Sequence, residues 1–183
     1  MLEELIEFSK IVGKLKKVER TGWVTNVGIE NPESVADHTF RSAILAMVFS
    51  DIKNLDTEKA MRMALIHDLS EALIGDWDSF AKKKLGVEKL KQKEEESMEK
   101  VVAFLPENLK EKYISVWKEF QEQKTEEAKL VKQLEKVEMV IQALEYEEEG
   151  YDKKRLEKFF DDVRPILKDE ELKNLFVILE KKF

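Results

Sequence analysis

Apolar residues recur every three or four positions along almost the whole chain, and this spacing constrains the fold more than any other feature. The repeat begins within residues 2–18 and returns in each later segment. Such a period places apolar side chains along one side of a helix, where they can be buried. We find no sustained alternation of the kind that strands need, and no internal repeat. The pattern therefore predicts an all-α fold.

Glycine, proline and capping residues divide this pattern into separate helices. We expect the first helix to continue until Gly22 breaks it, and residues 22–33 to form a loop or a short extended piece. Ser34 and Asp37 form a capping-box sequence that opens a second helix, with His38 in its first turns. The later helices are expected at residues 88–104, 107–123, 126–148, 152–162 and 169–181.

A third helix can begin at Asp56 or Thr57, whose side chains are suited to capping. Its apolar spacing continues through His67 and Asp68, which we place in its last part. His67 and Glu71 would then lie one turn apart on the same face, with Asp68 about 100° around the axis. This helix is therefore predicted to carry a histidine and carboxylates near its C-terminal end.

Length and cysteine content limit the class of protein. The chain has 183 residues, which fits one domain spanning residues 1–183 with a single core. It has no cysteine, which excludes disulfides and thiolate metal sites and favours a reducing cytoplasm. The N-terminal segment is acidic and amphipathic, and no apolar stretch approaches the roughly 20 residues that span a bilayer. We expect neither secretion nor insertion into a membrane.

The chain is acidic, with a formal net charge of −7 from 32 basic and 39 acidic residues. This excess of negative charge disfavours binding to the phosphates of nucleic acids, so no nucleic-acid partner is expected. A small anion can still bind wherever a metal ion and an arginine reverse the local field.

The sequence has only two histidines, 29 residues apart, and each lies next to an aspartate. His38 follows Asp37, and His67 precedes Asp68. Imidazole nitrogen and carboxylate oxygen together suit divalent manganese, cobalt, zinc, nickel or iron, and such mixed sites do not distinguish sharply among them. The pair by itself is weak evidence, because most lone histidines are ordinary core or surface residues. A neighbouring helix that brings His38 to His67 would turn the pair into a site for one metal ion.

The spacing of the histidines and of the acidic residues that follow them resembles that of the HD-domain metal-dependent phosphohydrolases. The shared pattern is a histidine, then His-Asp, then E-x-x-x-x-D. The residues that match it are His38, His67, Asp68, Glu71 and Asp76. Three segments, RTGW from Arg20, PESVADHTFR from Pro32 and the HDLSEALIGD stretch, look like the 5′-deoxynucleotidase branch of that superfamily. The resemblance extends from about residue 5 to Glu147.

This resemblance implies an all-α HD-domain helical bundle that holds one divalent transition metal ion. It implies His38, His67 and Asp68 as ligands, together with a carboxylate from a later helix. The family has an aspartate at that position, followed three residues later by an acidic residue, and this chain has Glu135 and Glu138 there. The extra methylene of Glu135 leaves two roles open, a direct metal ligand or an acceptor behind the ligands. We expect ligation by Glu135.

The resemblance also implies roles for the remaining residues. Glu71 is the expected general base, and Asp76 is expected to position the substrate or to manage the proton of the leaving 5′ oxygen, unless it is only a helix cap. Arg20 is expected to bind phosphate through its forked guanidinium, and Trp23 to wall the nucleotide pocket or stack on the nucleotide. If the resemblance is set aside, Arg20 is expected to be an ordinary surface cation and Trp23 a core anchor. Arg41 could face either the site or solvent.

The activity implied is hydrolysis of nucleoside 5′-monophosphates, in particular deoxy forms, to nucleoside and inorganic phosphate. Three alternatives stay open: a nucleotide- or metal-binding regulator without turnover, an HD hydrolase acting on nucleoside triphosphates or cyclic phosphodiesters, and a helical bundle without a site. The expected partner is a small-molecule nucleotide. Amphipathic helices with more apolar surface than one core needs favour a homodimer, and the resemblance points the same way.

Overall fold

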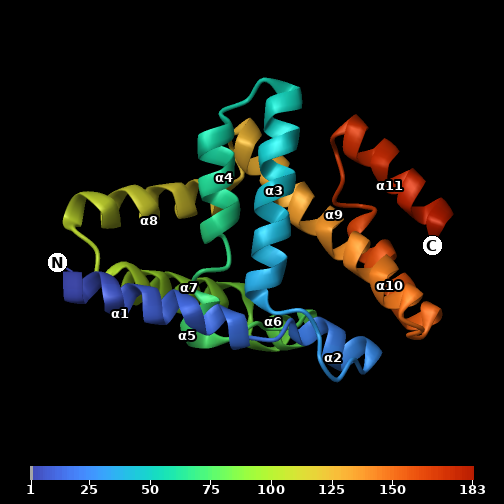
Figure 1. The fold of residues 1–183 in the computed structure, drawn as a ribbon, viewed down its shortest axis with the longest axis horizontal. Coiled ribbons are helices and arrows are strands. Elements are labelled where there is room, and N and C mark those ends of the chain that lie inside the picture. The colour runs from blue at the N-terminus through green and yellow to red at the C-terminus, as the bar shows by residue number, and fades with distance from the viewer. Residues whose placement is uncertain (1) are drawn as a thin grey trace.

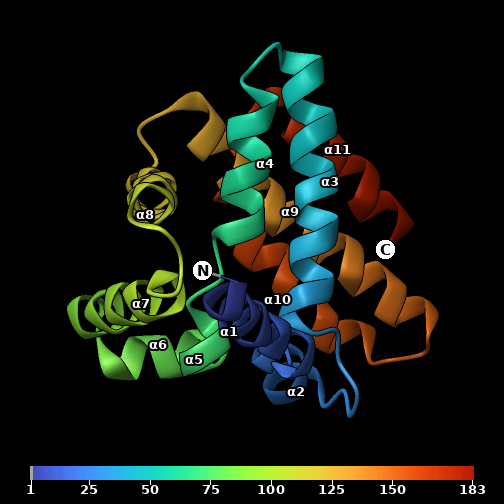
Figure 2. The same cartoon turned by 60° about the vertical axis from the view of Figure 1, so that its left-hand side comes forward.

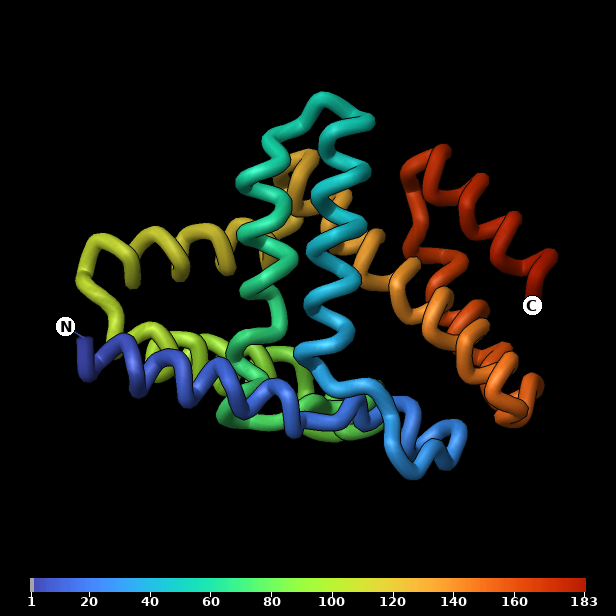
Figure 3. The backbone as a smooth tube through the Cα atoms, viewed as in Figure 1, coloured from blue at the N-terminus to red at the C-terminus, as the bar shows by residue number. Residues whose placement is uncertain are grey.

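The computed structural model describes residues 2–183, and within that range the regular structure is helical, without a named strand. Figures 1 and 3 show the order of the elements along the chain. The elements are α1 (Leu2–Gly13), the 3-10 helix η1 (Lys14–Lys17), α2 (Thr21–Val27), α3 (Val35–Lys53), α4 (Thr57–Ile66), α5 (Glu71–Ile74), α6 (Ser79–Leu85), α7 (Val87–Val102), α8 (Glu107–Glu122), α9 (Glu126–Glu148), α10 (Lys153–Val163) and α11 (Glu170–Lys182). The predicted all-α fold is confirmed. No helix in this range is long and apolar enough to cross a membrane.

Helix α9 is the element around which the larger part of the core is built. It packs against α3, α4, α8, α10 and α11, and in Figure 1 it passes behind α3 and α4. Its buried apolar side chains are Ala128, Leu130, Val131, Leu134, Val137, Val140, Ala143 and Tyr146. Its buried polar side chains are Gln133, Glu135, Glu138 and Gln142. One helix therefore contributes both to the core and to a buried polar region.

Helices α3 and α4 form an antiparallel pair joined by a short turn, as Figures 1 and 2 show. The predicted capping box opens α3: the Ser34 hydroxyl accepts from the Asp37 N–H, and the Asp37 carboxylate accepts from the Ser34 N–H at 2.9 Å. Asn54, in the left-handed region at φ 53°, ends α3. Asp56 caps α4 by accepting a backbone hydrogen bond. His38 thus lies in the first turn of α3, as predicted, and is fully buried.

Residues 22–33 are not one continuous loop, because most of α2 lies within them. The Thr21 N–H donates to the Asp76 carboxylate at 2.6 Å, and the Trp23 side chain of α2 is buried. Gly28, at φ 85°, ends the helix. Glycine and asparagine lower the helix propensity of this segment, whereas the contact that stabilises its start comes from a residue 55 positions away. The local sequence therefore did not indicate the helix.

The helices before and after this region also end earlier than predicted, since α1 stops at Gly13 and α4 stops at Ile66. His67 and Asp68 lie in a turn instead of a helix. The Nδ1 of His67 donates to the Ala64 carbonyl at 2.7 Å, which is the acceptor that a continuing α-helix would offer to the Asp68 N–H. The predicted shared helical face of His67 and residue 71 is therefore wrong.

The apolar interior consists of two clusters that meet near His67. The larger cluster surrounds α9, and the smaller one is formed mainly by α5, α7 and α8 with α1 packed against it. The Trp117 indole, in the smaller cluster, donates to the His67 carbonyl at 3.3 Å. The ring of Phe120, in the larger cluster, lies 5.5 Å from the His67 ring. Contacts from both clusters thus fix this histidine.

Candidate metal centre and catalytic site

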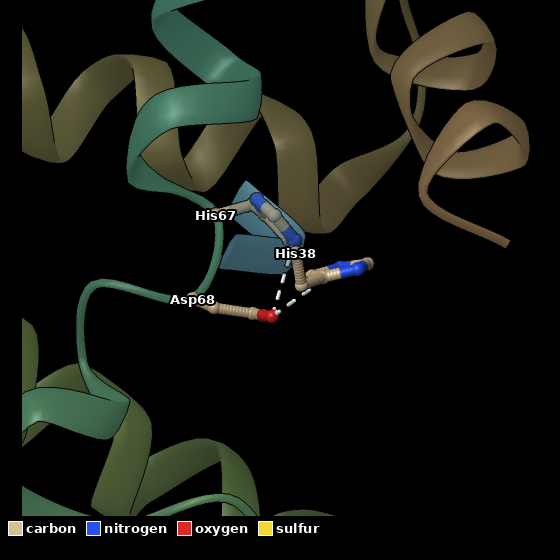
Figure 4. A group of neighbouring side chains, drawn as sticks. All are labelled: His38, His67 and Asp68. Carbon is tan, nitrogen blue, oxygen red and sulfur yellow. Dashed lines mark ion pairs between the residues drawn. The ribbon is translucent and has the colours of Figure 1, made fainter. Parts of the chain in front are cut away.

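Two histidine rings and one carboxylate converge where the start of α3 meets the turn after α4 (Figure 4). The Nε2 of His67 lies 3.1 Å from the Oδ2 of Asp68, and the Nε2 of His38 lies 3.9 Å from the same oxygen. One ligand atom from each residue lies within 4.8 Å of the others. The fold thus brings together three of the four residues that we expected to hold a metal ion.

Both imidazole rings are held through their Nδ1 atoms. The Nδ1 of His67 donates to the Ala64 carbonyl, and the Nδ1 of His38 pairs with the carboxylate of Glu138. Both Nε2 atoms are buried and have no hydrogen-bond partner among the described residues. Buried nitrogens are rarely left without a partner, and a divalent cation accepts the lone pair of a neutral imidazole. These two atoms and the Asp68 oxygen therefore fit a divalent metal ion.

Burial and nearby charges set the protonation of these three residues. Burial, together with the charge of Arg20, lowers the pKa of His38 to about 3, so its ring is neutral at pH 7. Burial acts to raise the pKa of Asp68, but His67 and Arg20 outweigh it and hold this pKa well below its usual range. Burial lowers and Asp68 raises the pKa of His67, with a net upward shift. A proton and a metal ion therefore compete for the His67 ring.

Glu135, the fourth expected ligand, lies on α9 outside this group of three. Its carboxylate oxygens form ion pairs with the Nζ of Lys132 at 2.7 Å and of Lys136 at 3.2 Å. Burial acts to raise the pKa of Glu135, but the two lysines lower it well below its usual range, and the two histidines act in the same direction. Glu135 therefore lies within electrostatic reach of the rings. Its role as a ligand stays a prediction.

Arg20 stands beside the three converging residues and links them to Asp76. Its Nη1 donates to the Asp68 Oδ2 at 3.4 Å and lies 4.0 Å from the Asp76 Oδ1. The other carboxylate oxygen of Asp76 accepts the Thr21 N–H and so stabilises the start of α2. The structure thus gives Asp76 a capping role, at the start of α2, and also places it next to Arg20. A role of Asp76 toward a substrate stays a prediction.

Glu71 is a buried carboxyl group at the start of α5. It is 7% exposed, and its Oε2 has no hydrogen-bond partner among the described residues. Burial, and then the charges of Asp68 and Asp76, raise the pKa of Glu71 well above its usual range. A carboxyl group with a raised pKa is better suited to proton transfer at neutral pH. The environment of Glu71 is therefore compatible with a general base.

A cavity of about 390 Å³ adjoins the three converging residues through Arg20, which lines it together with Trp23 and Asp76. Its basic side chains also include Lys82, Lys83, Lys136 and Lys158. Trp23 is only 1% exposed. Its ring stacks on Phe159 with 4.0 Å between centroids, and its indole donates to Glu33 at 2.9 Å. Trp23 is therefore a fixed wall of the cavity. It is also a core anchor, which is the role expected of this residue when the family resemblance is set aside.

Sequence reasoning did not single out the four lysines of this cavity or Glu33, and it left Arg41 open. Lys82 and Lys83 belong to a charge-rich segment that is typical of a solvated face. Arg41 points toward α9 and donates to Gln142 and Glu145, each at 2.8 Å. Those partners lie about a hundred positions away, so only the packing of α3 on α9 reveals them.

The helical fold and the site together define a class of protein, one that places a histidine and a later His-Asp pair around a single buried position. The sequence model of the HD domain matches residues 12–175, which is most of the chain. The chain belongs to the HD domain family.

Comparison with individual proteins gives more specific matches within this family. The protein named 5′-deoxynucleotidase HDDC2 from Xenopus laevis is 41% identical over 176 residues, covering 94% of this chain and 84% of the relative. HDDC2 from Mus musculus is 42% identical over 160 residues, covering 86% of this chain and 77% of the relative. The crystal structure of the PH0347 protein from Pyrococcus horikoshii OT3 matches with a TM-score of 0.78 at 32% identity, covering 100% of this chain and 98% of that one.

Proposed function

We propose that this protein is a metal-dependent 5′-deoxynucleotidase, which hydrolyses deoxynucleoside 5′-monophosphates to nucleoside and inorganic phosphate. The observation that carries the proposal is the convergence of the His38 Nε2, the His67 Nε2 and the Asp68 Oδ2, with the Arg20 Nη1 3.4 Å from that oxygen. The relatives named 5′-deoxynucleotidase support it, and the HD domain match over residues 12–175 includes all four residues.

A divalent metal ion held by His38, His67 and Asp68 would lower the pKa of a water molecule and polarise a phosphoryl oxygen. Mixed nitrogen and oxygen donors suit manganese, cobalt, zinc, nickel or iron. We assign Glu135 as the fourth ligand. Its oxygens are ion-paired with two lysines in this structure, so ligation would exchange those ion pairs for the metal.

The chain's own side chains bind the phosphate and move the proton. Burial acts to lower the pKa of Arg20, but Asp68 and Asp76 raise it further, so the guanidinium keeps its charge and can donate two parallel hydrogen bonds to phosphate. Glu71 accepts a proton from the attacking water. A bond forms between the water oxygen and phosphorus, the bond from phosphorus to the 5′ oxygen breaks, and that oxygen takes up the proton that Glu71 accepted as the nucleoside leaves. Asp76 keeps Arg20 and α2 in place.

The cavity suits the nucleoside part of such a substrate. Its volume of about 390 Å³ falls within the range of small-molecule pockets. Four lysines and Arg20 line it against the three aspartates Asp76, Asp78 and Asp162, so the lining has an excess of positive charge although the chain as a whole carries a net charge of −7. The aromatic side chains in its lining are Trp77, which is half-buried, and the nearly fully buried Trp23 and Phe159. The basic lining attracts an anionic nucleotide, and the aromatic rings favour a flat base.

We also propose that the chain forms a homodimer through the outer side of α3. In Figure 2, α3 lies at the front of the described chain, while its inner side buries polar groups such as His38 and Ser42. The apolar side chains exposed on the outer side are Phe40, Ile44, Val48 and Ile52. An apolar stripe about 18 Å long is a mark of an interaction site. A second copy presents the same stripe, and two-fold pairing would cover both.

Two further assignments belong to this proposal. We propose that the chain forms one domain over residues 1–183, which the match over residues 12–175 supports. We also place the protein in the cytoplasm, which the absence of cysteine supports.

The proposed activity is tested by a phosphate-release screen of all deoxynucleoside and nucleoside 5′-monophosphates against a panel of divalent ions. We expect release of orthophosphate, loss of activity on adding a chelator, and its recovery with a divalent ion. Replacing His67 or Asp68 by alanine should abolish it. Metal-loaded protein that releases no phosphate from any of these substrates would refute the proposal.

Other outcomes of the same screen identify the alternative functions. Thermal stabilisation by a nucleotide without phosphate release indicates a regulator. Release of pyrophosphate or triphosphate, or formation of a linear monophosphate from a cyclic phosphodiester, indicates a different HD hydrolase. Each outcome replaces the proposed activity by a defined one.

A further inference from the structure

A buried acidic pair adjoins the Nδ1 side of His38. Glu138 of α9 is fully buried, and one of its carboxylate oxygens pairs with the His38 Nδ1. Glu33 precedes α3, and its carboxylate, that of Glu138 and a His38 nitrogen lie within 4.8 Å of one another. Neither acid takes part in the reaction described above.

Arg41 contacts Glu138 on its other oxygen, with 3.5 Å between the Arg41 Nε and the Glu138 Oε1. The Nη atoms of Arg41 donate to Gln142 at 2.8 Å and to the two oxygens of Glu145 at 2.9 and 2.8 Å. Arg41 lies one turn beyond His38 on α3, and its three partners follow one another along α9. The orientation of His38 is thereby tied to the packing of α3 on α9.

Glu33, His38 and Glu138 could in principle hold a second metal ion, but their contacts argue against it. The charge of Glu138 is matched by Arg41, and the Glu33 Oε1 lies 4.0 Å from the Arg20 Nε. The His38 Nδ1 already pairs with Glu138, so it is not free for an ion. An arginine of the chain therefore lies beside each carboxylate, where a second cation would otherwise be needed.

We propose that Glu138 is a positioning residue of the metal centre: its carboxylate fixes the Nδ1–H tautomer and the ring plane of His38, so that Nε2 faces the metal position. Histidines that bind metals commonly donate their other nitrogen to such a partner. The inference rests on the proposed metal centre. His67 differs, because its Nδ1 donates to the neutral carbonyl of Ala64 at 2.7 Å. Loss of the Glu138 charge should thus change the tautomer and orientation of the His38 ring and leave those of the His67 ring unchanged.

The test uses the two histidines of the chain as separate probes. In full-length protein labelled with ¹⁵N-histidine, the ring signals report the tautomer of each residue before metal is added. Isothermal titration calorimetry with Mn²⁺ or Zn²⁺ then gives the affinity of the protein for the metal ion. Glu138→Gln is expected to weaken metal binding by about 10- to 100-fold and to shift the ring signals of His38 alone. Glu148→Gln, at an exposed site on the same helix, is the matched control and should change neither measurement.

Wild-type metal affinity together with unchanged His38 signals in Glu138→Gln would overturn the proposal. If this variant does not fold, Arg41→Gln replaces it, because that side chain is 31% exposed. A smaller shift confined to His38 is then expected, and no shift contradicts the proposal. Wild-type protein that binds no metal refutes the proposed function instead, and the ring signals recorded without metal still decide the role of Glu138.

Discussion

The side chain of His67 ends a helix, and the same contact orients its own ring as a candidate metal ligand. Its Nδ1 donates to the Ala64 carbonyl, which directs Nε2 toward Asp68 at 3.1 Å. The same hydrogen bond takes the acceptor that α4 would need in order to continue past Ile66. Backbone and site are therefore shaped together by one residue.

The first prediction at this scale concerns Glu71 as the base. Burial and the charges of Asp68 and Asp76 raise the pKa of Glu71 well above its usual range, and a base acts only when it is ionised. The kcat/KM for phosphate release should therefore fall as the pH is lowered through this raised pKa. Glu71→Gln is expected to lower kcat by about 10²- to 10⁴-fold and to remove that acidic limb. The dependence of kcat/KM on pH, recorded for the wild type and for Glu71→Gln, tests both expectations.

Circular dichroism of Glu71→Gln shows whether the variant is folded, and Glu148→Gln again serves as a control on an exposed carboxylate. If Glu71→Gln is folded and keeps the acidic limb of the wild-type profile, another group titrates and Glu71 is not the base.

Several site residues could be predicted from the sequence, and the reason is chemical. With only two histidines in the chain, the imidazole ligands had no competitors, and Asp68 adjoins one of them. Glu33 and Arg41 could not be assigned, because their partners are set by packing between distant segments. The ion pairs of Glu135 with two lysines likewise depend on side-chain conformations that spacing does not determine.

At the scale of the element, α2 shows where local propensity and tertiary contacts disagree. Its sequence includes Gly22 and Asn26, which weaken a helix. The helix is nevertheless formed, with Asp76 at its start and the buried Trp23 packed on Phe159. Sequence periodicity located the long helices α7 to α11 to within about two residues, because each has a continuous apolar face.

Two glycine-to-alanine substitutions are predicted to change the free energy of unfolding in opposite directions. Gly28 ends α2 at φ 85°, a region that costs other residues about 1–2 kcal/mol. Gly28→Ala should lower the free energy of unfolding by about that amount. Gly13, at φ −61°, is helical, and an added Cβ there would meet nothing within 4 Å. Gly13→Ala should raise the free energy of unfolding by about 0.4–1 kcal/mol.

Urea unfolding followed by circular dichroism measures both glycine variants against the wild type. A stabilising Gly28→Ala would show that α2 does not end in the left-handed conformation. A destabilising Gly13→Ala would show that α1 does not extend to that residue.

At the scale of the whole molecule, α3 is unusual because its outer side is apolar while its inner side carries polar groups. It buries His38, Thr39, Ser42 and Ser50, and it packs against α4 and α9. In a chain with 39% charged residues, the exposed apolar stripe from Phe40 to Ile52 is therefore expected to be covered. The class of fold could be predicted from spacing, but the neighbours of each helix could not, since periodicity gives a buried face and not its partner.

The matching prediction is that the wild type is a dimer and that Ile44→Glu with Val48→Glu yields a folded monomer, because the two carboxylates would lie within the paired stripes. Sedimentation equilibrium over a range of concentrations measures the mass. Ile178→Glu, at a similarly exposed position on α11 (52%), is the control and should stay dimeric. A wild type that is monomeric at every concentration, or a control that dissociates equally, contradicts the assigned face.

The four-residue turn between α4 and α5 limits how this region can change. Its backbone hydrogen bonds, such as the Leu69 N–H to the Ile66 carbonyl at 3.1 Å and the Glu71 N–H to the Asp68 carbonyl at 3.0 Å, each span three residues. One inserted residue would rotate everything after it by about 120° and carry the Glu71 carboxyl away from Asp68. The length of this segment is therefore as fixed as its two site residues, and one inserted or deleted residue in it should disrupt the site even when His67 and Asp68 are kept.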